Sequence, residues 1–423
     1  MKILYVSQYF PPEMGAPAAR AVELSRLWVN DGHEVSVLTG FPNHPTGVVP
    51  PEYRKKLHRL VIRERVDGVD VIRTWLLPLP NRRSWERALN YSSFFLSAAA
   101  TGTFLPKVDV VIGTSPQLLV GLSAWWIARR QKVPFIFEVR DLWPESLAAV
   151  GAGSPRSTLH RTLSQVAGFL YRNSDHIVVV TRAFKTYLAE HWGVPLDKIS
   201  VVENGADTQL FSPQAVDASI RKDLDCEGKF VVSYIGTMGM AHGLETLLEA
   251  ARQLQLRAPE VLFLLIGEGA EKQRLVNLAK SLGLTNVRFV DQQRHEEIPA
   301  YICGSNACLV MLKKAELFKT VLPTKLLEFM SCARPVILAV DGEARRIMDD
   351  AGAGIFVEPQ NAADLSAAIL RLAEDPTLCD VLGSNGRRYV TRHFARQQTA
   401  ERYIDVLENL CRPKAVEGVT ATA

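Results

Sequence analysis

The sequence predicts an α/β protein of two doubly wound, Rossmann-like domains that face each other across a cleft. Short apolar runs of strand length alternate with helical patterns along almost the whole chain, which is typical of parallel α/β construction. A chain of 423 residues is longer than one hydrophobic core usually supports. The alternation breaks at 204–213 and then starts again, so we expect the chain to cross there into a second domain.

The first domain is expected to span residues 1–205 and the second residues 206–385. In the first domain the predicted strands are 3–6, 34–38, 69–72, 109–112, 133–139, 176–180 and 199–202, and the predicted helices include 17–30, 117–130 and 158–172. In the second domain the predicted strands are 230–235, 261–266, 287–290, 307–311, 336–340 and 355–357. A last helical stretch, 386–411, is expected to pack back on the first domain. Residues 412–423 lack apolar periodicity and are predicted to be a disordered tail.

Charge and cysteine content exclude several classes of protein. The balance of 49 basic and 45 acidic residues gives a net charge of +4, which is too mild to indicate nucleic acid binding. The cysteines are Cys226, Cys303, Cys308, Cys332, Cys379 and Cys411. Since none has C-x-x-C spacing or a histidine at zinc-ligand spacing, we expect reduced, buried thiols in a cytoplasmic protein. Asp223 and Asp225 have the D-x-D spacing of a metal site but lie in a polar segment, so we predict a solvated turn and no metal ligand.

The most informative segment is 323–337, PTKLLEFMSCARPVI. Pro323 suits the first turn of a helix, because its fixed φ is helical and its missing N–H would be unpaired there. A helix start has free N–H groups and a positive dipole end, so it attracts phosphate, and Lys325 adds a cation. Glu328, one turn further on, suits the hydroxyls of a sugar attached to that phosphate. We therefore assign Thr324, Lys325, Leu326 and Glu328 to a nucleotide site.

Glycine-rich turns follow two strands of the second domain. Gly236, Thr237 and His242 lie between the strand 230–235 and the next helix, where three glycines in eight residues bring backbone N–H groups near a phosphate. A lone loop histidine is weak evidence, but together with Lys325 His242 becomes a candidate phosphate partner. Glu268 lies in the turn after the strand 261–266 and is expected to face solvent unless the cleft recruits it.

The turn after the first strand is the corresponding feature of the first domain. Gly15 and Ala16 let a ligand approach the backbone just before a helix start. A dinucleotide fingerprint needs G-x-G-x-x-G, and this turn has one glycine, so NAD binding is disfavoured. A simple turn glycine remains the alternative.

Three charged residues, Glu138, Arg140 and Asp141, follow the buried run 133–137. Charges at the end of a buried strand are costly unless they pair or act on a ligand. One interpretation is that Arg140 pairs with Asp141 or with Glu138, and the other is that these residues act in the active site. The position at the mouth of the expected cleft favours the active site.

Segment 53–105 suggests a membrane contact. Residues 53–59 carry four cations and no acid, and residues 88–105 are largely apolar, with Trp85 at their edge. The apolar stretch is too short and too rich in hydroxyl groups for a transmembrane span. A basic patch beside an apolar helix can dock on an anionic inner leaflet. The alternative is a buried helix beside a solvated basic face.

Taken together, these motifs resemble the retaining glycosyltransferases of family four, which have the two-domain GT-B fold. The likeness runs from residue 3 to about residue 400. The matching segments are 1–20 (opening strand and glycine loop), 31–39 (G-H-E-V strand), 201–211 (N-G-x-D…F), 267–271 (G-x-G) and 328–337 (E-x-M-x-x-x-x-P-V-I).

The chain also departs from the family pattern. Thr320 stands where a second glutamate is usual, and Thr237 and His242 stand where an arginine and a lysine commonly hold the donor diphosphate. The pair Arg140-Asp141 replaces a frequent His-Asp. These changes, with 141–146 (D-L-W-P-E-S) and 323–325 (P-T-K), are similar to a subgroup that includes bacterial L-fucosamine transferases of surface-polysaccharide assembly (O-antigen and capsule). Lys325 is then expected to supply the missing charge.

The resemblance implies a metal-independent, retaining transferase that needs no cofactor. It implies transfer of a sugar, such as an N-acetylated amino or deoxyamino sugar, from a nucleotide diphosphate sugar, UDP-linked, to a glycan or lipid-linked saccharide of the cell surface. The candidate catalytic residues are Arg140, Asp141 and Lys325, and the candidate donor-binding residues are Gly15, Ala16, Gly236, Thr237, His242, Glu268, Thr324, Lys325, Leu326 and Glu328. The expected location is cytoplasmic, on the inner face of the membrane. The alternatives are a GT-B nucleotide-sugar 2-epimerase and a non-enzymatic nucleotide-sugar-binding protein.

Overall fold

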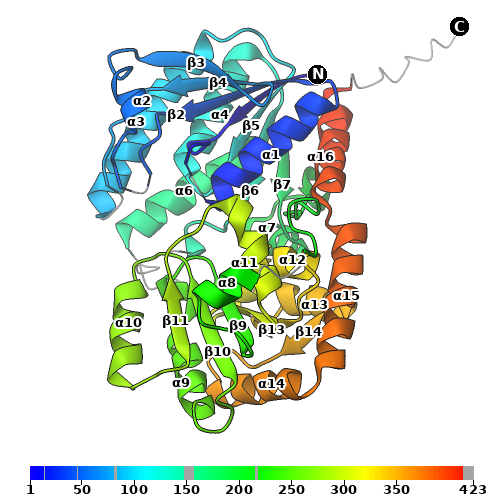
Figure 1. The fold of residues 1–423 in the computed structure, drawn as a ribbon. Helices are drawn as coiled ribbons and strands as arrows, with labels where there is room; N and C mark the ends of the chain where they lie inside the picture. The colour runs from blue at the N-terminus through cyan, green and yellow to red at the C-terminus, as the bar shows by residue number, and fades with distance from the viewer. Residues whose placement is uncertain (14, 45, 81–82, 147–156, 215–217, 413–423) are drawn as a thin grey trace, which may run out of the picture.

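The computed structural model describes residues 1–423 except 14, 45, 81–82, 147–156, 215–217 and 413–423, and it has two α/β domains (Figure 1). The first contains an eight-stranded sheet of order β3-β4-β2-β1-β5-β6-β7-β8, and the second a six-stranded sheet of order β11-β10-β9-β12-β13-β14. Neighbouring strands are parallel except β3 and β4, which pair antiparallel. The predicted fold class, two doubly wound α/β domains, is confirmed.

The first domain has these described elements. Its strands are β1 (Lys2–Val6), β2 (Glu34–Gly40), β3 (Val61–Val66), β4 (Val69–Thr74), β5 (Val110–Thr114), β6 (Phe135–Val139), β7 (His176–Val179) and β8 (Ile199–Val201). Its helices are α1 (Ala16–Asn30), α2 (Pro51–Arg54), α3 (Ser84–Thr103), α4 (Leu118–Gln131), α6 (Thr158–Asn173) and α7 (Arg182–Trp192).

The second domain repeats the alternation. Its strands are β9 (Phe230–Ile235), β10 (Val261–Ile266), β11 (Val287–Val290), β12 (Ala307–Met311), β13 (Val336–Ala339) and β14 (Gly354–Phe356). Its helices are α8 (Ala218–Asp223), α9 (Glu245–Leu254), α10 (Lys272–Ser281), α11 (Ile298–Gly304), α12 (Thr324–Ser331), α13 (Glu343–Ala351), α14 (Ala362–Glu374) and α15 (Pro376–His393).

Each sheet is buried on both faces, because successive side chains of a strand point to opposite sides. In β1, Leu4 and Val6 pack into a core with α3, α4, α6 and α7, whereas Ile3 and Tyr5 pack with α1 and α16 (Arg396–Cys411). In β9 the corresponding cores involve α11, α12 and α13 on one side and α9, α10 and α14 on the other. The sheets therefore fix the positions of the turns at their carboxyl ends.

The predicted helical stretch 386–411 is divided in two by the structure. Helix α15 ends at His393, and α16 begins at Arg396. Between them, the Ala206 N–H donates to the Phe394 carbonyl (2.9 Å) and the Arg396 N–H donates to the Ala206 carbonyl (2.9 Å). The chain therefore crosses between the domains twice, along two adjacent segments.

Helix α16 lies against α1 of the first domain, along the right side of the view (Figure 1). The rings of Trp28 and Tyr403 pack edge to face at 5.2 Å, and the indole N–H of Trp28 donates to the Ala400 carbonyl (3.2 Å). Residues 413–423, which make up most of the predicted tail, lie outside the described residues.

None of the helices in the described ranges combines the length and the apolar content that crossing a bilayer requires.

Candidate active site

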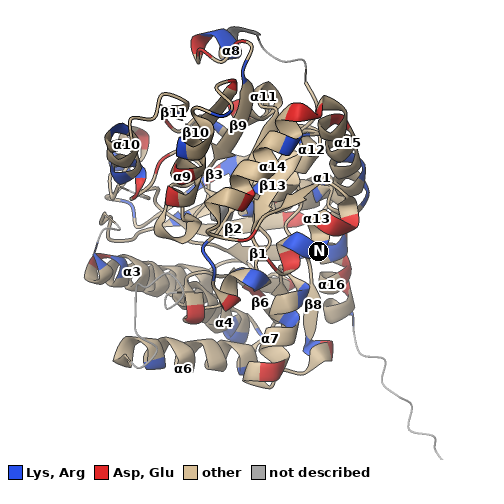
Figure 2. Ribbon diagram, turned by 90° about the horizontal axis from the view of Figure 1, so that it is seen from below, with Lys and Arg blue, Asp and Glu red and all other residues tan. Residues whose placement is uncertain are grey.

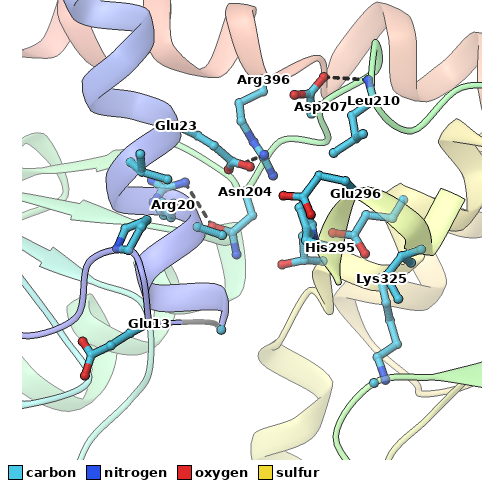
Figure 3. Close-up of a pocket in the computed structure, with 18 of the residues that line it drawn as sticks. Glu13, Arg20, Glu23, Asn204, Asp207, Leu210, His295, Glu296, Lys325 and Arg396 are labelled. Atoms are coloured by element: carbon cyan, nitrogen blue, oxygen red, sulfur yellow. Dashed lines mark hydrogen bonds and ion pairs between the residues drawn. The ribbon is translucent and has the colours of Figure 1, made fainter. Parts of the chain in front are cut away.

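A cavity of about 850 Å³ opens between the two domains, at the carboxyl ends of their strands (Figure 3). Doubly wound sheets bind ligands in this position. The first domain contributes the turn before α1, part of α1 and Arg140, and the second contributes the turns after β9, β10 and β11 and the start of α12. The sequence-predicted residues that line it are Gly15, Arg140, Gly236, Thr237, Glu268, Thr324, Lys325 and Glu328.

Lys325 presents a positive charge on the cavity wall. Its Nζ atom lies 4.2 Å from the centre of the Tyr234 ring. A Cβ atom built on Gly236 would lie 2.8 Å from the same Nζ, so the ammonium group rests directly over the glycine backbone. The Nζ atom is buried and makes no hydrogen bond to any described residue. Burial lowers the pKa of Lys325 to about 8, against the opposing effect of Glu328. A buried ammonium group without an anionic partner favours binding of an anion.

The start of α12 supports Lys325. Pro323 is the residue before the helix and Thr324 is its first residue, and no side chain caps the free N–H groups. The side chain of Leu326 is buried in the core, and its N–H donates to the Pro323 carbonyl (3.0 Å), so Leu326 anchors the turn. Glu328 lines the cavity. Burial raises the pKa of Glu328 to about 7, an effect that Arg396 and Lys325 oppose and Glu23 increases.

The glycine turns after β9 and β10 pack against each other. Gly236 and Gly267 have φ of +134° and +143°, and a Cβ atom on Gly267 would lie 2.1 Å from the Gly236 carbonyl oxygen. Both positions therefore require glycine. The N–H of Met238 donates to the Glu268 carbonyl (2.8 Å). The Glu268 side chain itself pairs with Lys272 (2.5 Å) at the cavity rim.

His242 is not among the residues that line the cavity, and it lies behind the cavity wall formed by Gly236, Thr237 and Lys325. Its ring packs edge to face on Tyr234 at 5.9 Å, and its Nδ1 lies 3.3 Å from the Gly239 carbonyl. Burial, together with the charge of Lys325, lowers the pKa of His242 to about 4. His242 is therefore neutral near pH 7, and the positive charge of this wall comes from Lys325.

On the first domain, Glu138 forms an ion pair with Arg20 (2.9 Å), and the charges of Arg20 and Arg140 together lower its pKa against the opposing effect of burial. Glu138 also accepts hydrogen bonds from the hydroxyls of Tyr5 (2.6 Å) and Thr114 (2.7 Å), which makes it a structural residue at the end of β6. Arg140 lines the cavity, and burial lowers the pKa of its guanidinium group while Glu138 raises it.

Asp141 faces its own turn. Its carboxylate accepts hydrogen bonds from the indole N–H of Trp143 (3.0 Å) and from the Ser146 hydroxyl. The geometry thus makes Asp141 a residue that shapes the loop beside Arg140. Gly15 precedes α1 with φ +132°, and Ala16 is the first residue of that helix.

Thr320, where the resemblance suggests a second glutamate, ends the short 3-10 turn η4 (Glu316–Thr320). Its carbonyl accepts a hydrogen bond from the Thr181 hydroxyl of the first domain (2.9 Å). This segment thus serves as an interdomain contact.

The structure adds cavity residues that sequence reasoning missed, most of them on α1 and the crossing segments (Figure 3). Glu23 of α1 forms a buried ion pair with Arg396 at the start of α16. Arg20 donates to the side-chain oxygen of Asn204 (3.0 Å). Arg20 and Glu23 are one helical turn apart on the core side of α1, which is a usable signal, whereas nothing in the sequence links Glu23 to Arg396.

Glu13 and His295 also line the cavity. Glu13 accepts hydrogen bonds from the N–H groups of Asn43 and His44 (2.9 Å each), and burial raises its pKa to about 7. His295 packs edge to face on Phe211 at 5.2 Å. Across all described residues, no group of three or more His, Cys, Asp or Glu side chains is arranged to hold a metal ion.

Comparison with known proteins agrees with this architecture. Residues 15–205 match the glycosyl transferase 4-like domain, and residues 216–389 match the domain described as glycosyl transferases group 1. The two domains and the cleft between them therefore define a glycosyltransferase of the GT-B class.

Among curated relatives, the chain is similar to the putative colanic acid biosynthesis glycosyl transferase WcaI of Escherichia coli K12. The two are 25% identical over 427 residues, covering 96% of this chain and 99% of WcaI. Among solved structures, sucrose-phosphate synthase from Thermosynechococcus elongatus has a TM-score of 0.77 at 23% identity, over 97% of this chain and 98% of that one. HepE from Anabaena in complex with UDP-glucose has a TM-score of 0.73 at 17% identity, over 97% and 100%. These structural likenesses concern the fold alone.

Proposed function

We propose that this glycosyltransferase moves a sugar from a UDP-linked nucleotide sugar to a hydroxyl group of a glycan or lipid-linked saccharide, with retention of anomeric configuration. The observation that carries the proposal is the Lys325 ammonium group, which is buried and without a hydrogen-bond partner among the described residues on the cavity wall. HepE, a structure of the same fold, was solved with UDP-glucose, and WcaI is named for colanic acid biosynthesis. Both support a nucleotide-sugar donor and a polysaccharide product.

The donor diphosphate binds at the start of α12 in this proposal. The first-turn N–H groups and Lys325 hold its oxygens, and Glu328 accepts hydrogen bonds from the ribose hydroxyls. As the bond between the anomeric carbon and the diphosphate oxygen breaks, negative charge grows on the leaving group, where Lys325 and the helix dipole stabilise it. We propose that this positive charge suffices without a metal ion.

The acceptor oxygen bonds to the anomeric carbon from the side that the diphosphate leaves. A leaving phosphate oxygen takes the acceptor's proton, so no dedicated base is required. Arg140 lines the opposite wall and orients the donor sugar or the acceptor, and Asp141 holds the turn that positions it. Domain closure would exclude water and limit hydrolysis.

The finer assignment rests on segments 141–146 and 323–325. They favour an N-acetylated amino or deoxyamino sugar of the L-fucosamine type and an acceptor in surface-polysaccharide or glycolipid synthesis. We place the enzyme in the cytoplasm, on the inner face of the membrane. The family matches do not favour a 2-epimerase or a non-enzymatic binding protein.

The test screens purified protein against nucleotide sugars by thermal stabilisation and then follows transfer by NMR of the anomeric carbon. Lys325→Ala should lower turnover by about a hundredfold or more, since removing a group that stabilises developing charge has effects of roughly 10²–10³. Lys280→Ala, at an exposed position near the end of α10, is the matched control and should be neutral. Near-normal turnover of a folded Lys325→Ala protein removes Lys325 from the mechanism, and an inverted product rejects retention. Sugar conversion without an acceptor would indicate epimerisation.

A further inference from the structure

Helices α3, α4 and α6 lie side by side on the first domain and form one outer face (Figure 2). Their inner sides complete the core over β1, β5 and β6. Helix α4 packs between the other two. On the outer side, Leu122, Trp125 and Phe169 are only partly buried against this core, so the apolar composition of this face requires a separate explanation.

An apolar groove runs over this face. It has a volume of about 570 Å³, and each described residue that lines it is apolar. Leu96 comes from α3, Trp125 and Trp126 from α4, and Phe169 from α6. The rings of Trp125 and Phe169 meet edge to face at 4.9 Å and form part of the groove.

The groove continues into exposed apolar side chains. Leu96 is 65% exposed, Trp126 is 44% exposed and Phe104, just after α3, is 86% exposed. No charged residue occurs in α3 after Arg87, so the exposed side of this helix is uncharged over its last four turns. Large exposed apolar patches on soluble proteins mark sites of protein or membrane interaction.

The charged residues of the three helices are almost all positive. The three helices contain five arginines (Arg87, Arg129, Arg130, Arg161 and Arg172) and one acidic residue, Glu86. Arg129 and Arg130 are exposed and follow Trp126 at the end of α4, and the Arg130 guanidinium lies 6.0 Å from the centre of the Trp126 ring. None of the five arginines forms an ion pair with a described residue.

We propose that the α3–α4–α6 face docks this enzyme on an anionic phospholipid bilayer, with a lipid acyl chain in the groove and Arg129 and Arg130 paired with lipid phosphates. Apolar side chains, tryptophans and cations on one face match the acyl chains, the interface and the headgroups of such a bilayer. A second copy of the same face would bring like charges together, which disfavours a symmetric dimer. The inference rests on the membrane location in the proposed function and is independent of sugar transfer.

This surface shares the apolar stretch 88–105 with the one that the sequence suggested, since most of that stretch is helix α3, but it does not include the basic segment. The basic segment 53–59 belongs to a separate small cluster, in which Tyr53 packs with Phe41, Val49 and Ile62. The positive charge of the membrane contact we propose therefore comes from Arg129 and Arg130 of α4 and not from segment 53–59.

The apolar part is tested by flotation of the full-length protein with phosphatidylcholine–phosphatidylglycerol vesicles at low salt. Leu96→Glu should lower the partition coefficient by at least about tenfold, because it replaces an exposed leucine, which the bilayer would bury, by a negative charge at an anionic surface. Leu256→Glu, at a leucine that is 90% exposed on the second domain, is the matched control and should bind as the unsubstituted protein does.

The charged part is tested with Arg129→Gln/Arg130→Gln. Each arginine near an anionic surface contributes about fivefold, so the double variant should bind about 30-fold more weakly. The control Arg371→Gln/Arg392→Gln removes two exposed arginines of α14 and α15 and should leave binding unchanged. Binding of the unsubstituted protein should weaken as salt rises, and pure phosphatidylcholine vesicles should bind it weakly.

Absence of binding to anionic vesicles, or equal binding by the Leu96→Glu variant, overturns the proposal. The proposal is also overturned if the unsubstituted protein is a dimer, Leu96→Glu makes it a monomer, and vesicle binding does not change. In that case the groove would bind a second copy of the protein. Transfer to a water-soluble acceptor should be unchanged in the Leu96→Glu variant. For the unsubstituted protein, sugar transfer without vesicle binding would contradict this inference alone, and vesicle binding without sugar transfer would contradict the proposed function alone.

Discussion

Replacing Gly236 with alanine should weaken donor binding through Lys325. Gly236 has φ +134°, and an added Cβ would lie 2.8 Å from Nζ and 3.3 Å from Cε of Lys325. Two effects follow. The backbone strain lowers the free energy of unfolding by roughly 1–3 kcal/mol, and the methyl group pushes the ammonium away from its position over the glycine.

The second effect sets the size of the change in UDP affinity. A hydrogen bond between charged groups contributes about 1.5–3 kcal/mol, so losing the Lys325 contact should raise the Kd of UDP by about 10- to 150-fold. Gly32→Ala is the control for strain alone, because Gly32 has φ +87° and nothing lies within 4 Å of its added Cβ. That variant should lose stability and keep its UDP affinity.

The assay is calorimetric titration of UDP into the unsubstituted protein, Gly236→Ala, Lys325→Met and the double variant, with urea unfolding of each. In the Lys325→Met background, Gly236→Ala should change the Kd by less than about threefold, since contacting residues show coupling of roughly 0.5–3 kcal/mol. Equal weakening in both backgrounds would refute the coupling to Lys325, as would unchanged affinity in the single Gly236→Ala variant.

Three further predictions concern charge. UDP affinity should depend on pH with a bell-shaped profile, which rises through about pH 7 as Glu328 ionises and falls above about pH 8 as Lys325 loses its proton. Glu328→Gln should therefore remove the fall on the acid side, and Lys325→Arg should remove the fall on the alkaline side. A flat calorimetric profile contradicts this. Glu23→Gln and Arg396→Met should each lower the free energy of unfolding in urea by about 3–5 kcal/mol, because each leaves a buried charge unpaired, and the double variant should recover most of that loss. Simple additivity of the two losses in the double variant would argue against the ion pair. Asp141→Asn should lower stability by about 1–3 kcal/mol and leave the Kd of UDP unchanged, whereas a large rise in Kd would place Asp141 at the donor.

Most strands follow directly from the sequence, because buried parallel strands are continuous apolar runs. Strand β3 escapes this reasoning. Its residues V-I-R-E-R-V leave alternate positions exposed, and it pairs antiparallel at the sheet edge. The break between α15 and α16 was also missed, since the hydrogen bonds of Ala206 that fix it come from a distant part of the chain.

The candidate site also has features that the sequence predicts and features that it does not. Turns at the carboxyl ends of strands are predictable from strand order, and the structure places Gly236 and Lys325 in contact there. The partner of a charged side chain is not predictable when neighbouring polar groups compete for it or when the partner is distant in sequence. Trp143 and Ser146 donate hydrogen bonds to the carboxylate of Asp141. Arg396 pairs with Glu23 only because α16 returns to the first domain.

The contact of Lys325 with the donor diphosphate is tested most directly by comparing UDP with UMP. Both ligands share the base, the ribose and one phosphate, so the difference in their Kd isolates the second phosphate. We expect the unsubstituted protein to bind UDP at least about tenfold more tightly than UMP, and Lys325→Met to lose most of that preference, because a charge-assisted contact is removed. An equal preference for UDP in both proteins would contradict the assignment of Lys325 to the diphosphate.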